Sequence, residues 1–147
     1  MFRGNLNSEG TGAFAVSLET CKAVYYKWIA DNPSHPSFSE TIIPLMLSRD
    51  LKLIDFEALT NLDGEIFRKI YRDMNYEPSF STAINICAAM NLSLVATIHV
   101  MLNAGFNILS DNHKKFLYII SEMQGESLFT RNRVLIALGE KSLSKNI

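Results

Sequence analysis

The amino-acid sequence predicts an all-α protein, for two reasons. From Phe38 onward, hydrophobic residues recur at spacings of three and four, which is the period of an amphipathic helix. No segment alternates hydrophobic and polar residues as a half-buried strand would. The 147 residues, 48% of them hydrophobic and 20% charged, are enough for one domain with a proper core.

The N-terminal part of the chain divides into an arm and a helix. Residues 1–16 are largely polar, include three glycines and show no hydrophobic period, so we expect a flexible arm. Ser17 is a candidate cap for a helix that runs to about Ala30. The prolines between Asp31 and Ser37 should end this helix, which makes residues 17–36 an N-terminal helix with a proline-rich linker.

Residues 37–110 contain five predicted helices. The first follows Ser39, and Pro44 should lie in its first turn or kink it. The second is short, over residues 55–62, and Asp63 is a plausible N-cap for the third. Ser79 and Ser93 should cap the fourth and the fifth. The fifth helix should end at the glycine of the Ala-Gly-Phe run, residues 104–106.

The same periodicity predicts which residues these helices bury. In the first and third helices they are Ile42, Ile43, Leu45, Met46, Leu47, Ile66, Phe67 and Ile70. In the fourth and fifth they are Ala83, Ile84, Ile86, Cys87, Met90, Val95, Ile98, Met101 and Leu102. Two more helices, at about residues 112–123 and 130–140, should form a C-terminal extension over residues 111–147.

Several stretches resemble one known family. Residues 51–73, LKLIDFEALTNLDGEIFRKIYRD, look like a second helix, a turn and a third helix. Residues 77–106 look like a proline-started fourth helix, a break at AAMNLS and a fifth helix that ends in AGF. This arrangement is similar to the Cro/repressor-like (Xre-type) helix-turn-helix family. The closest likeness is to a bacterial subgroup with a C-terminal helical extension, through FRKI (67–70), YEPS (76–79), AGF (104–106) and VLIALGEKSL (134–143).

The resemblance implies a fold and a function. The fold would be a five-helix helix-turn-helix domain over residues 37–110, with an added N-terminal helix and a C-terminal helical pair. The function would be that of a bacterial or phage transcriptional regulator that binds double-stranded DNA as a homodimer. In such domains the third helix enters the major groove with its N-terminal residues at the base edges.

Candidate DNA-binding residues follow from that placement. Arg68 is the best base reader, because a guanidinium can bind guanine O6 and N7 together. Lys69 and Arg72 suit phosphates, and Thr60 and Asn61 in the turn could donate to the DNA backbone. The positions expected to face outward from the third helix are Gly64, Glu65, Arg68, Lys69 and Arg72.

The charge distribution keeps a second function open. The formal net charge is −1, and acidic residues outnumber basic ones by three between Ser37 and Ser110. Phosphate binding normally needs a basic excess. The alternative is a protein-binding regulatory or adaptor module that keeps the fold without DNA contacts. Tyr25, Tyr26 and Trp28 would be its contact residues, because aromatic side chains anchor interfaces. The C-terminal segment is more basic, through Lys114, Lys115, Arg131, Arg133, Lys141 and Lys145, and is either a phosphate-contacting flank or a solvated surface.

No pattern in the sequence indicates catalysis, a metal or a cofactor. His35, His99 and His113 lack metal-ligand spacing, and no HExxH, CxxC or phosphate-binding glycine loop occurs. His99 is expected to be partly buried, and Cys21 and Cys87 to be reduced, buried thiols. The first residues lack the apolar core of a cleavable signal, and polar residues interrupt the apolar tract from Ala83 to Val100. We therefore expect a cytoplasmic protein that is not an enzyme and does not enter a membrane.

Overall fold

The computed structural model describes residues 19–20, 23–24, 26–27, 30–31 and 36–143. The chain divides into two compact units, Met1–His35 and Pro36–Ile147. In the first unit, all eight described residues are helical, which agrees with a helix in this region. Within it, the Lys27 ammonium pairs with Asp31 at 2.9 Å. The predicted cap Ser17, as well as Cys21, Tyr25, Trp28 and His35, lies outside the described residues.

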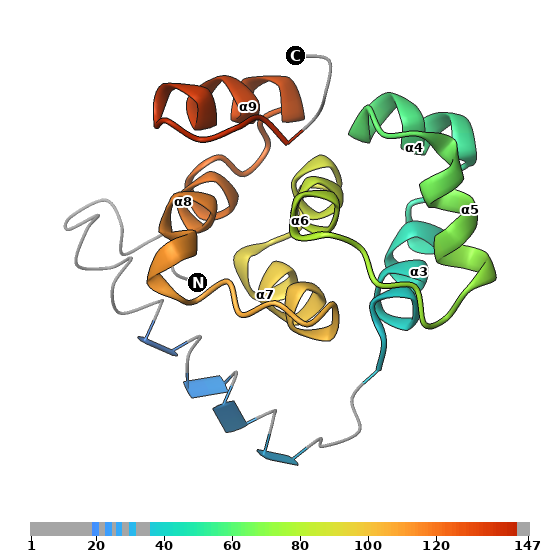
Figure 1. Ribbon diagram of the computed structural model, residues 1–147, viewed down its shortest axis with the longest axis horizontal. Coiled ribbons are helices and arrows are strands. Elements are labelled where there is room, and N and C mark those ends of the chain that lie inside the picture. Colours follow the sequence, from blue (N-terminus) through green and yellow to red (C-terminus); the bar gives the residue numbers. More distant parts are fainter. Residues whose placement is uncertain (1–18, 21–22, 25, 28–29, 32–35, 144–147) are drawn as a thin grey trace. The chain divides into compact units, whose positions relative to one another are not determined.

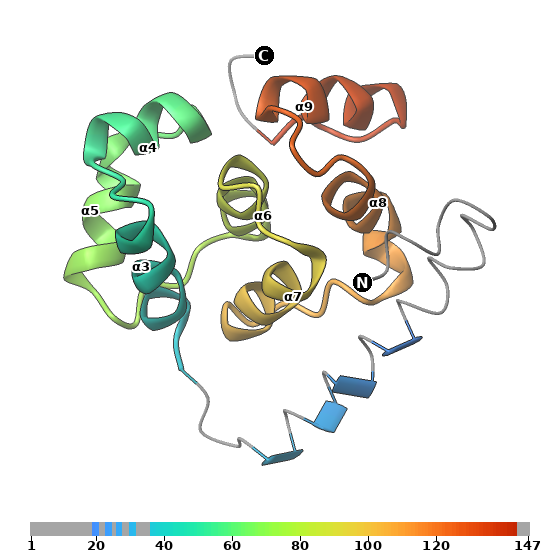
Figure 2. The ribbon, with the colours of Figure 1, turned by 180° about the vertical axis from the view of Figure 1, so that it is seen from behind.

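The second unit is all-helical over residues 36–143, and no strand occurs in that range. Its elements are α3 (Phe38–Ser48), α4 (Leu53–Thr60), α5 (Gly64–Arg72), α6 (Phe80–Ala89), α7 (Leu94–Asn103), a 3₁₀ turn (Asp111–His113), α8 (Lys114–Glu122) and α9 (Leu128–Ala137). α6 lies at the centre, in contact with α4, α7 and α9 (Figure 1). From behind, α3, α4 and α5 flank α6 on one side and α8 and α9 on the other (Figure 2).

Polar side chains start these helices as the sequence predicts. Asp63, Ser79 and Ser93 each accept a hydrogen bond from a backbone amide in the first turn of α5, α6 and α7. The start of α3 differs from the prediction, because Ser37 caps it in a reciprocal arrangement with Glu40. Ser39 is buried and donates instead to the carbonyl of Asp73, at 3.2 Å, which ties α3 to the end of α5.

Four helices end in the same way, with a left-handed residue just after the cap. These residues are Asp50, Asn91, Gly105 and Gly139, after α3, α6, α7 and α9. After α7, for example, the amides of Gly105 and Phe106 donate to the carbonyls of Leu102 and Met101 at 2.9 Å each. This is the Schellman pattern, and it confirms the predicted glycine stop. It satisfies helix-end carbonyls that would otherwise lack a donor.

The core follows most of the predicted pattern. Ile42, Met46 and Ile70 are fully buried, as are the five residues predicted for α6 apart from slight exposure of Met90. Two predictions are wrong: Leu47 is 63% exposed and Val95 is 51% exposed. Both lie near the end of a helix. The hydrophobic period places them on the buried face, but no neighbouring helix covers that face at the helix end. Ile43, Leu45, Ile66, Phe67 and Leu102 are half-buried. Pro44 lies in the middle of α3, exposed, and not in its first turn.

Arg131 connects the C-terminal helices to the rest of the unit through hydrogen bonds. Its side chain is fully buried, so the interpretation of Arg131 as a solvated or phosphate-contacting residue is wrong. The guanidinium donates to the carbonyl of Ala88 in α6 (3.2 Å), the side chain of Asn91 (2.7 Å) and the carbonyl of Met123 after α8 (2.6 Å). One side chain thus joins α6, α8 and α9 through acceptors at helix ends.

Two buried asparagines hold the segment after α9. Asn132 of α9 accepts from the backbone amide of Leu143 at 2.7 Å. Asn85 of α6 donates to the carbonyl of Leu143 at 2.8 Å and to that of Thr60 at 3.0 Å. The Leu143 backbone is therefore bound on both sides, next to the end of α4. No helix in the described residues is long and apolar enough to cross a membrane.

Candidate functional site on helix α5

A tight turn joins α4 to α5. α4 ends at Thr60 and α5 begins at Gly64, so three residues link the two helices. Asn61 adopts the left-handed conformation (φ 56°, ψ 30°), and its amide donates to the carbonyl of Glu57 at 2.9 Å. Asp63 then caps α5 by accepting from the amide of Glu65 at 2.8 Å. A left-handed residue followed by a capping aspartate is why this sequence turns here.

Two candidate DNA contacts are buried at this turn. Thr60 is 1% exposed, and its hydroxyl donates to the carbonyl of Phe56 at 2.7 Å and accepts from the amide of Leu62 at 3.1 Å. The prediction that Gly64 faces outward is wrong, because Gly64 is buried under α4. Its amide donates to Glu57 Oε2 at 3.1 Å, and a methyl group on Gly64 would approach that oxygen to 2.7 Å. Neither Thr60 nor Gly64 presents a group to a ligand outside the domain.

Four other candidates share one exposed face of α5. Glu65, Arg68, Lys69 and Arg72 are separated by three, four and seven positions, so they lie along one side of the helix. The opposite side carries the buried Ile70 and the half-buried Ile66. Asn61 is exposed in the turn that precedes this face. Four of these five predicted residues are exposed, as expected, and Glu65 is half-buried.

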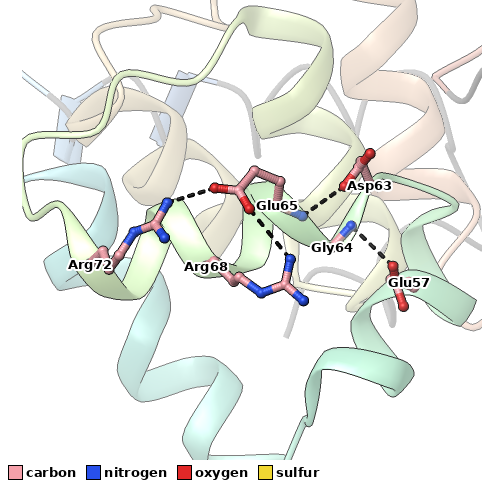
Figure 3. Close-up of polar contacts among 6 residues, drawn as sticks. All are labelled: Glu57, Asp63, Gly64, Glu65, Arg68 and Arg72. Atoms are coloured by element: carbon pink, nitrogen blue, oxygen red, sulfur yellow. Dashed lines mark hydrogen bonds and ion pairs between the residues drawn. The ribbon is translucent and has the colours of Figure 1, made fainter.

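Glu65 binds both arginines of this face (Figure 3). Its carboxylate lies 2.6 Å from Arg72 Nη2 and 3.3 Å from Arg68 Nη1. The hydrogen bond from Arg72 is the main cause that holds the pKa of the Glu65 carboxyl below its usual value, and Arg68 acts in the same direction. Lys69 has no ion pair with any residue in the described part of the chain.

A shallow apolar groove runs beside the arginines, and no motif in the sequence indicated it. Leu53 of α4 and Phe67 and Tyr71 of α5 line the groove, together with Arg68 and Arg72. The Phe67 ring lies 4.9 Å from the Tyr71 ring, centroid to centroid. The one available signal was the spacing of Phe67 and Tyr71, which places two aromatic rings one turn apart between the buried and charged faces.

The other candidate groups do not form a site of their own. His99 is exposed, so the prediction of partial burial is wrong, and His113 stacks on Phe80 with ring centroids 4.4 Å apart. Cys87 is fully buried, as predicted, and burial raises the pKa of its thiol to about 12. Among the residues that the structure describes, no cluster of histidine, cysteine and acidic side chains could hold a metal ion.

Comparison with known proteins identifies no family, so function is inferred from the surface of α5. No protein-family model, no curated protein and no solved structure matches the chain.

Proposed function

We propose that residues 37–110 form a helix-turn-helix domain that binds duplex DNA through the exposed face of α5, as a bacterial or phage transcriptional regulator does. One observation carries the proposal. Arg68, Lys69 and Arg72 lie together on the exposed side of the second helix of a pair that is joined by a three-residue turn. In helix-turn-helix proteins the second helix of such a pair lies in the major groove.

Each cationic side chain has a role in this proposal. Arg68 is closest to the start of α5 and would read guanine, whose O6 and N7 accept from one guanidinium. Lys69 and Arg72 would contact phosphates and supply affinity that does not depend on sequence. Glu65, at the start of the helix, could accept from a cytosine amino group. Thr60 and Gly64 have no part, because both are buried.

Fluorescence polarisation tests the proposal. The protein is titrated into labelled random duplexes of about 20 base pairs, two turns of B-DNA, in about 50 and 200 mM salt. We expect binding that weakens as salt increases, because phosphate contacts release condensed cations. Lys69→Gln should weaken binding to every duplex and lower the salt dependence by about one contact. Absence of binding even near 50 mM salt would refute DNA binding.

The groove beside α5 favours the adaptor function as the second candidate. Apolar and aromatic side chains line it together with two arginines, which suits a peptide that combines a large apolar residue with an acidic one. Selection from a displayed random peptide library tests this reading. Peptides of that composition should lose binding to Tyr71→Ala and keep it with Tyr118→Ala, an exposed tyrosine on α8. If the enriched peptides bind Tyr71→Ala as tightly as the wild type, the groove is not their binding site.

The predicted contact through the N-terminal aromatic residues stays a prediction. Tyr26 is 58% exposed, and Tyr25 and Trp28 lie outside the described residues. The homodimer also remains an expectation from the resemblance.

A further inference from the structure

Carboxylates occupy the groups on α5 that a phosphate would use (Figure 3). The amides of Gly64 and Glu65 donate to Glu57 and Asp63, at 3.1 and 2.8 Å. The guanidiniums of Arg68 and Arg72 pair with Glu65. Amides at a helix N-terminus and guanidinium groups are the donors that proteins use to bind phosphate. On this face, the protein's own carboxylates already bind them.

Glu65 differs from the other two carboxylates in what it does. Glu57 and Asp63 bind backbone amides at the start of α5, so they help to form the helix. Among the residues that the structure describes, the side chain of Glu65 binds only the two arginines. The three side chains are 44% (Glu65), 53% (Arg68) and 63% (Arg72) exposed. Ion pairs with this much exposure are weak and are screened by salt, so a polyanion can replace them.

We propose that Glu65 is an internal competitor: it holds Arg68 and Arg72 in the unbound protein, and the guanine and phosphate groups of DNA must displace it. The inference rests on the proposed DNA-binding function and adds its regulation. Displacement removes two ion pairs and leaves a carboxylate beside the duplex, where it repels phosphate. Glu65 therefore lowers the affinity for random duplexes, and a duplex that offers several good contacts, including a cytosine amino group to Glu65, binds better.

Glu65→Gln is the direct test, with random duplexes at about 50 mM salt. The amide keeps the size of the side chain and removes its charge. We expect binding roughly 2- to 30-fold tighter than that of the wild type, the range that two exposed ion pairs allow. The matched control is Glu122→Gln, which removes one exposed negative charge from α8, a helix that packs on α7 and α9. It should change affinity by less than about twofold, because α8 does not belong to the α4–α5 pair that is proposed to contact DNA and salt screens the remaining effect of its charge.

A double-mutant cycle separates competition from simple repulsion. When Arg68→Gln and Arg72→Gln are both present, Glu65→Gln should give a clearly smaller gain than in the wild-type background, because Glu65 then has no arginine to hold and only its repulsion of phosphate remains. Circular dichroism of each variant establishes that it is folded before binding is compared.

The outcomes distinguish this inference from the proposed function. A gain in Glu65→Gln equal to that in Glu122→Gln, or one that persists in full without the arginines, overturns the competitor role and leaves DNA binding in place. If neither the wild type nor any variant binds near 50 mM salt, DNA binding is refuted and the competitor role with it. If Glu65→Gln binds and the wild type does not, DNA does not displace Glu65 in the wild type, and both DNA binding by the wild-type protein and the competitor role are refuted.

Discussion

Replacing Arg131 by methionine tests whether one buried side chain holds the C-terminal helices in place. Methionine fills similar space and lacks the three hydrogen bonds to Ala88, Asn91 and Met123. Hydrogen bonds from a charged donor stabilise a fold by about 1.5–3 kcal/mol each. Relief of the buried guanidinium from its own desolvation offsets part of that loss. We expect the free energy of unfolding to fall by about 3 kcal/mol.

Urea unfolding followed by circular dichroism measures this change. In thermal unfolding, the melting temperature should fall by about 12 °C, since a change of 1 kcal/mol in the free energy of unfolding shifts it by roughly 4 °C in a domain of about 110 residues. The matched control is Arg133→Met on the same helix. Arg133 is exposed, with its guanidinium carbon 5.7 Å from the centre of the Phe129 ring. Its loss should cost less than about 1 kcal/mol. If the two variants unfold within about 1 kcal/mol of each other, desolvation cancels the hydrogen bonds and the reasoning is wrong.

Three further predictions concern other parts of the second unit. Asn85→Ala leaves the carbonyls of Thr60 and Leu143 without this donor. The free energy of unfolding, measured in urea, should therefore fall by about 2–4 kcal/mol, and a decrease below about 1 kcal/mol would contradict the role of Asn85. Because burial raises the pKa of Cys87 to about 12, its thiol stays protonated in the folded protein while the unfolded thiol ionises. The free energy of unfolding is therefore unaffected by this thiol below about pH 8.5 and decreases by up to about 1.4 kcal/mol per pH unit from there to about pH 12. Cys87→Ala should flatten a plot of unfolding free energy against pH in this range, and an unchanged slope would contradict the reasoning. Gly105→Ala should cost about 1–2 kcal/mol in thermal unfolding, since φ is +93° and no atom lies within 4 Å of the added methyl group; a neutral result would show that the turn relaxes.

The candidate site could be predicted in part. Arg68, Lys69 and Arg72 recur at helical spacing from Ile66 and Ile70, so the sequence alone places them on the outer face of α5. Gly64 was misplaced, because a residue in the first turn can be covered by the preceding helix. Whether α4 lies over that turn depends on the path of the three linking residues. The ion pairs of Glu65 were not predicted either, since several acidic side chains in the sequence could pair with these arginines.

Local chemistry in the sequence determined where most helices begin and end. Capping groups such as Asp63, Ser79 and Ser93 act on amides two or three residues away, so their effect can be read without knowing the fold. The same holds for Gly105, whose conformation depends on having no side chain. Hydrophobic period likewise predicted which residues of α6 are buried, among them Ala83, Ile84 and Ile86.

Only the tertiary structure decided which polar residues are buried. Arg131 and Arg133 are two positions apart on one helix, yet the first is fully buried and the second exposed. Arg131 is stable there because its acceptors come from α6, about 40 residues earlier, and from the end of α8. A buried polar group is stable only when partners satisfy it, and those partners are brought together by packing between helices that no local pattern specifies.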